Sequence, residues 1–149
     1  MIVSYDLFTE AFLSKITEYD FCVLSETDRQ TIVDGYMKRA CAHFSKVCAY
    51  EMPVSDTAER SFDLDVADDV DLDEIVDIVS EGMLLQWMKQ HMYKQENLEL
   101  TLNTADFTSY SPAELLYRMT NAYKMIKRDF TVMMREYSYR HGDLTDLHI

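Results

Sequence analysis

The chain has 149 residues, of which 48% are hydrophobic and 28% charged. This balance excludes wholesale disorder and is enough for one domain with a core of its own. Only three glycines and two prolines are present, which argues against glycine-rich phosphate loops, collagen and turn-dense β-sandwiches or barrels and favours an all-helical fold. A net charge of −13 argues against a protein that coats nucleic acid or binds membranes through basic residues.

The first predicted helix covers residues 5–16, where apolar residues recur at helical spacing. Ser25, followed three positions later by Asp28, resembles an acidic variant of the capping box. It predicts a second helix that runs to about Cys48. Gly35 lies inside that helix, where glycine costs about 1 kcal/mol relative to alanine. We therefore expect Gly35 to mark a close crossing between helices.

Residues 49–70 break the helical period and predict an acidic loop, with a short extended stretch at Ser61–Val66. Asp71 together with Glu74 predicts the start of a third helix that runs to about Tyr93. The second half of this helix is apolar on several faces. Such a helix is either central in its bundle or covered by a partner.

Residues 94–110 predict a polar connection, with a short helical turn at Leu98–Leu102. The sequence Ser-Pro-Ala-Glu at 111–114 then predicts the start of the last helix, because Ser111 can cap it, proline suits the first helical position and glutamate can reach back to the cap. The apolar stripe that follows ends near His141. Residues 143–149 are expected to form a short tail. The whole chain, 1–149, is predicted to be a single helical domain with about four main helices, of which the C-terminal one is long.

Charge is unevenly distributed along the chain. Residues 51–81 hold twelve acidic residues and one basic residue, Arg60, for a net charge of −11. Residues 111–141 hold six basic and three acidic residues, for a net charge of +3. One interpretation is a solvated acidic loop. The other is complementary charge between subunits, which sets register and association rate more than affinity.

No motif for catalysis, cofactor binding or metal binding is evident in the sequence. The acids from Asp69 to Glu74 alternate as at the start of an EF-hand, but the glycine and the final glutamate of that loop are missing. The four histidines are far apart in sequence, and neither CxxC nor HExxH occurs. Cys22, Cys41 and Cys48 are odd in number and predict reduced thiols, with Cys41 and Cys48 on one helix face. We expect neither an enzyme nor a dedicated metal site.

Two stretches of the sequence resemble a known family. They are Glu81-Gly-Met-Leu-Leu-Gln-Trp87 through His91-Met-Tyr-Lys-Gln-Glu96, and Thr104-Ala-Asp-Phe-Thr-Ser-Tyr110 with Ser111-Pro-Ala-Glu-Leu-Leu-Tyr-Arg118. Both resemble small proteins from the virion gene clusters of tailed phages of Gram-positive bacteria. The helix at 71–96 is also similar to the central helix of phage head–tail connector (adaptor) proteins.

The resemblance implies a helical adaptor in the neck of a virion, present in the host cytoplasm before assembly. Such adaptors form a homo-oligomeric ring, expected to be dodecameric, between the portal protein and a tail-proximal neck or tail-completion protein. DNA passes through the ring without being bound specifically, and an acidic wall keeps the like-charged DNA from adhering. The longer acidic insertion at 49–70 departs from the connector pattern, as does the shorter connection before the last helix.

A second class of function fits the acidic composition. The chain could be a DNA mimic, or another phage protein that binds a host protein, but mimics spread carboxylates along exposed faces whereas here they are concentrated in one segment. For the adaptor, we expect the subunit or partner interface to involve the eight residues that follow. They are Arg128, Arg135, Asp68, Asp69, Asp71, Leu144, Leu147 and Ile149.

Overall fold

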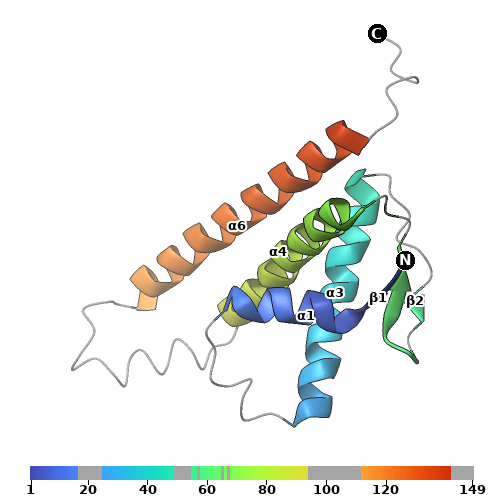
Figure 1. The fold of residues 1–149 in the computed structure, drawn as a ribbon. Helices are drawn as coiled ribbons and strands as arrows, with labels where there is room; N and C mark the ends of the chain where they lie inside the picture. Colours follow the sequence, from blue (N-terminus) through green and yellow to red (C-terminus); the bar gives the residue numbers. More distant parts are fainter. Residues whose placement is uncertain are drawn as a thin grey trace.

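The computed structural model describes residues 1–16, 25–48, 55–56, 58–64, 66, 68–93 and 112–141. Its helices are α1 (Tyr5–Ser14), α3 (Glu26–Cys48), α4 (Asp69–Tyr93) and α6 (Pro112–His141). Its strands are β1 (Ile2–Ser4), β2 (Ser55–Asp56) and β3 (Ser61–Asp63). The chain is an all-α bundle of four described helices with a small sheet at one side, which confirms the predicted fold class (Figure 1).

Helix α4 lies at the centre of the bundle and packs against α1, α3 and α6. This position explains why it is apolar on several faces. Met83 is fully buried, Leu85 is nearly so, and Trp87 packs against the core from a partly buried position. The sequence predicts that such a helix is either central in its bundle or covered by a partner, and the structure shows that it is central.

The core is formed where α1, α3 and α6 meet α4. Its largest members from the helices are Tyr5, Phe8, Phe12, Tyr36, Met37, Phe44, Ile75, Ile78, Met83, Phe130, Met134 and Tyr137. Helix α6 contributes the last three and runs alongside α4 over much of its length (Figure 1). At 30 residues and 1.5 Å per residue, it is about 45 Å long.

The close helix crossing is at Gly82 and not at Gly35, so that prediction was wrong. A Cβ atom on Gly82 would lie 2.8 Å from the Cβ of Ala40 and 2.8 Å from the ring of Phe130. Helices α3 and α6 therefore approach α4 most closely at the one residue of α4 that lacks a side chain there. A Cβ atom on Gly35 would meet nothing within 4 Å.

The segment expected as an acidic loop, 49–70, contains two strands and the first two residues of α4. The sheet is antiparallel throughout, in the order β1-β3-β2, and Val3 pairs with Phe62. Phe62 is buried against the rings of Tyr5 and Phe8, at centroid distances of 4.7 and 5.6 Å. The predicted extended stretch is confirmed only over Ser61–Asp63. Strands of two or three residues are too short to show an alternating pattern, which is why the others were missed.

Side-chain caps define two of the helix starts. Ser25 accepts a hydrogen bond from the backbone N–H of Asp28 at 3.2 Å, as predicted for α3. In α4 the cap is Asp68, whose carboxylate accepts from the backbone N–H of Asp71 at 2.9 Å. The helix therefore begins before Asp71, and the expected Asp71–Glu74 cap was wrong. Glu74 instead faces α6.

Arg60, the single basic residue of the acidic segment, ties the sheet to two helices. Its guanidinium donates to both carboxylate oxygens of Asp34 in α3, at 3.0 and 2.9 Å, and to Asp6 in α1 at 2.9 Å. These carboxylates raise the pKa of Arg60. The backbone of Arg60 is left-handed, with φ of 50°. Its carbonyl oxygen accepts a hydrogen bond from the N–H of Tyr5 at 2.9 Å.

Four predictions fall outside the described residues: the turn at Leu98–Leu102, the cap at Ser111, the thiol of Cys22 and the tail 143–149. The last helix does begin at Pro112 and its described part ends at His141, in agreement with the expected bounds. Among the described helices, none combines the length and the apolar character that crossing a membrane requires.

Candidate functional site

The side of α6 that faces away from the bundle is the first candidate site. Phe130, Met134 and Tyr137 are buried against the bundle, and a helical period of 3.6 residues places a different set of side chains on the opposite side. The large apolar members of this outer face are exposed by 67, 65, 42 and 76%: Tyr117, Met125, Val132 and Tyr139. Single exposed apolar residues are common, but these four recur every seven or eight residues along one face of the helix.

Arg128 and Arg135, both named from the sequence, lie on this outer face of α6. The two are seven residues apart, like Met125 and Val132, so basic and apolar side chains are interleaved. Both arginines are exposed, and neither forms an ion pair with any side chain in the part of the chain that the structure describes. We call these six residues (Tyr117, Met125, Arg128, Val132, Arg135 and Tyr139) the α6 outer face.

The second candidate site is a group of exposed acids at the start of α4. Asp68, Asp69 and Asp73 are exposed to solvent there. They fall within about a turn and a half at the start of α4, which begins at Asp69. Asp68 also serves as the cap of the helix. We call these three carboxylates the α4 acidic end; Glu59, Asp63 and Asp77 of the predicted acidic segment are also exposed.

Other acids of α4 have basic partners within the same chain. Lys15 of α1 lies 3.0 Å from a carboxylate oxygen of Asp77 and 2.8 Å from one of Glu81. Near the start of α4, Glu74 pairs with Arg140 of α6. Part of the charge complementarity that the sequence predicts between subunits is therefore satisfied inside one chain.

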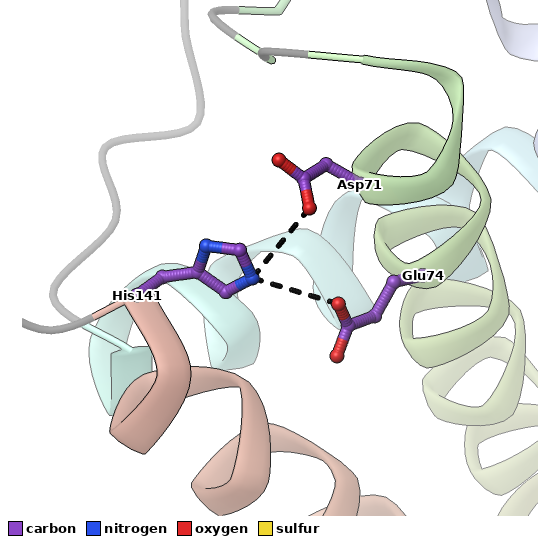
Figure 2. Close-up of side chains that lie close together, drawn as sticks. All are labelled: Asp71, Glu74 and His141. Atoms are coloured by element: carbon purple, nitrogen blue, oxygen red, sulfur yellow. Dashed lines mark ion pairs between the residues drawn. The ribbon is translucent and has the colours of Figure 1, made fainter.

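Asp71 meets the far end of the last helix (Figure 2). The Nε2 atom of His141 lies 3.8 Å from a carboxylate oxygen of Asp71 and 3.5 Å from one of Glu74. Asp71 is one of the residues expected at an interface, but the sequence does not connect it with His141. No local pattern could make that connection, because about 70 residues separate them along the chain.

The acids at 69–74 are helical, so their alternation is not that of a calcium-binding loop.

The predicted interface residues Leu144, Leu147 and Ile149 lie outside the described residues.

Both described cysteines are reduced thiols. Burial raises the pKa of Cys41 to about 12 and that of Cys48 to about 11. The Cys48 thiol donates a hydrogen bond to the carbonyl oxygen of Met134 at 3.3 Å, which joins α3 to α6. A nucleophilic cysteine needs the opposite shift, toward the thiolate, so neither residue is suited to that chemistry.

Comparison with known proteins adds no relative. No protein-family model, no curated protein and no solved structure matches the chain.

Proposed function

We propose that this chain is a structural virion protein: a head–tail adaptor that forms a ring below the portal and surrounds the path of the DNA. The observation that carries the proposal is the α6 outer face, an interleaved stripe of apolar and basic side chains that its own bundle leaves uncovered. Aromatic residues, methionine and arginine are the residue types enriched in protein interfaces. The resemblance of residues 81–96 and 104–118 to small virion proteins of tailed phages, and of the helix at 71–96 to head–tail connectors, is the basis for proposing this kind of assembly.

A ring requires two different patches on each subunit, so that one copy's first patch meets the next copy's second. The α6 outer face and the α4 acidic end have opposite charge and lie on different helices. We propose that they are these two patches. The net charge of −13 then suits the wall of a DNA channel, because phosphates are repelled from it.

The proposal is tested by size-exclusion chromatography with light scattering, on the full chain alone and mixed with the portal protein of the same virion. We expect a ring-sized species of this chain, or a defined complex with the portal, at low salt. A chain that stays monomeric at every concentration and ignores the portal would contradict the adaptor. If that monomer bound a DNA-binding host enzyme instead, the mimic would be the correct class.

A further inference from the structure

We propose that Asp71, Glu74 and His141 form a binding site for one divalent transition-metal ion, such as Zn²⁺ or Mn²⁺, which would join the start of α4 to the end of α6. One ligand atom from each of the three side chains lies within 4.8 Å of the other two. Figure 2 shows the imidazole of His141 pointing between the two carboxylates. This inference is independent of the proposed function.

The spacing of the three side chains is close to that of a metal site. Bonds of about 2.0–2.2 Å place the ligand atoms of a tetrahedral site about 3.4 Å apart. In this structure Nε2 of His141 is 3.5 Å from Glu74 and 3.8 Å from Asp71. The two sides that meet at His141 therefore need to contract by only a few tenths of an ångström, and the third side, between the two carboxylates, is no longer than 4.8 Å.

The chemistry of the three ligands selects the class of ion. Imidazole nitrogen suits zinc and its neighbours in the first transition row, whereas Ca²⁺ and Mg²⁺ prefer oxygen alone. Two carboxylates offset the +2 charge of the ion, although Arg140, which pairs with Glu74, adds one positive charge beside them. Three protein ligands leave at least one coordination position for water, and the side chains are 18 to 33% exposed, which leaves a route from solvent.

Two neighbouring side chains already hold the ligands in place. The ring of the buried Tyr137 stacks on that of His141 at a centroid distance of 4.2 Å and an interplanar angle of 27°. Arg140 binds one carboxylate oxygen of Glu74, while the other oxygen faces His141. Outer groups of this kind orient metal ligands. The C-terminal end of α6 is the negative end of its helix dipole, whereas the start of α4 is the positive end of its own, so the two dipoles largely offset each other at the site.

A simpler role for the same residues is an ion pair between protonated His141 and the two carboxylates. Both arrangements join α4 to α6, but only the metal site requires the unprotonated imidazole and takes up an ion. Titration of the metal-stripped full chain with Zn²⁺ therefore distinguishes them. The chain should carry Cys22→Ser, so that this thiol does not bind the probe.

We expect one Zn²⁺ ion per chain by calorimetry and a rise in melting temperature on binding. His141→Ala, Asp71→Asn and Glu74→Gln should each weaken binding by more than about tenfold. Co²⁺ in place of Zn²⁺ should give visible absorption bands that these three variants lose. Circular dichroism of each variant without metal checks that α6 still forms.

The matched controls are His43→Ala and Asp73→Asn. His43 lies beside Arg39 and Lys89 at a hollow of about 380 Å³ between α3 and α4, where positive charge repels a cation. Asp73 is an exposed acid in the same turns of α4 but is not part of the cluster. Both variants should bind Zn²⁺ like the parent chain. Absence of Zn²⁺ binding by the parent, or equal binding by His141→Ala, would overturn the proposal and leave the ion pair.

Discussion

The guanidinium group of Arg60 forms ion pairs with two helices of the bundle. It joins the sheet to α1 and α3 through Asp6 and Asp34, and it lies over the ring of Tyr5 at 5.7 Å. The carboxylate of Asp34 is only 18% exposed, so it is poorly solvated without this partner. Buried and half-buried carboxylates that lose their partner are costly.

Replacing Arg60 should therefore lower the free energy of unfolding. We expect Arg60→Ala to cost about 1–3 kcal/mol, because Asp34 loses two charged hydrogen bonds. Arg60→Lys should recover only part of this, since an ammonium group cannot bind both oxygens of Asp34 in the planar geometry of arginine. Arg60→Gly should be more stable than Arg60→Ala, because glycine adopts the left-handed backbone without strain. Urea denaturation of the three variants measures these differences, and an Arg60→Ala chain as stable as the parent would contradict the assignment.

Because Cys41 is buried, we expect its thiol to react slowly. We also expect the free energy of unfolding to decrease at alkaline pH. With the pKa of Cys41 raised from 9.0 to about 12, the folded chain retains a proton that the unfolded chain loses. Stability is then fully present below about pH 9 and decreases as the pH rises toward 12. A Cys41→Ala chain should show a smaller decrease. In a Cys22→Ser background at pH 8, a thiol reagent should modify the folded chain far more slowly than the urea-unfolded chain; equal rates would contradict this prediction.

At the scale of the elements, the position of α4 depends on the absence of a side chain at Gly82. Ala40 of α3 and Phe130 of α6 both lie closer to this position than a Cβ atom tolerates. Phe130 is 3% exposed and Ala40 is fully buried, so neither can move outward freely. Helix α4 is therefore held between α3 and α6 at a position that has no room for a Cβ atom.

The two helical glycines provide a matched pair of substitutions. Gly82→Ala should destabilise the chain by about 1–3 kcal/mol, because the added methyl group forces α3 or the Phe130 ring to shift. Gly35→Ala should stabilise it by about 0.5–1 kcal/mol, because the position has open space and alanine is the better helix former. Thermal melting of both variants gives the comparison. Equal effects of the two substitutions would show that the crossing is not close at Gly82.

At the scale of the whole molecule, some acidic and basic side chains form ion pairs within the chain, whereas others are exposed to solvent. Lys15, Arg60 and Arg140 pair with acids of the bundle. The α6 outer face keeps two unpaired arginines among the described residues, and the α4 acidic end keeps three exposed acids. Exposed pairs are worth only about 0–1 kcal/mol each. Their contribution to assembly would therefore come from repetition around a ring and would fall with salt.

Charge reversal on the α6 outer face tests this arrangement. We expect Arg128→Glu with Arg135→Glu to weaken assembly while leaving helicity and melting temperature nearly unchanged, since both side chains are exposed. The control is Lys38→Glu with Lys46→Glu, which makes the same charge change on exposed positions of α3. Reversing Asp69 and Asp73 to lysine should then restore part of the assembly. Light scattering at low and high salt measures all three chains, and normal assembly by the arginine variant at low salt would exclude the charge pairing.

Features that depend on residues within about four positions of one another can be predicted from the sequence alone. The helical class, the end of α3 at Cys48, its cap at Ser25, and the start of α6 at Pro112 follow from periodicity and capping, which are local properties of the backbone. Arg128 and Arg135 are expected at an interface because the last helix carries a net positive charge, and both are exposed in the structure.

Contacts between distant segments were decided only by packing in three dimensions. The pairing of β1 with β3, the contact of Gly82 with Ala40 and Phe130, and the meeting of His141 with Asp71 and Glu74 join residues roughly 40 to 70 positions apart. Periodicity shows which face of a helix is apolar, but not which helix covers it or at which residue two helices are closest. Those choices depend on how whole side chains fit together in a close-packed core, and that fit has no local signature in the sequence.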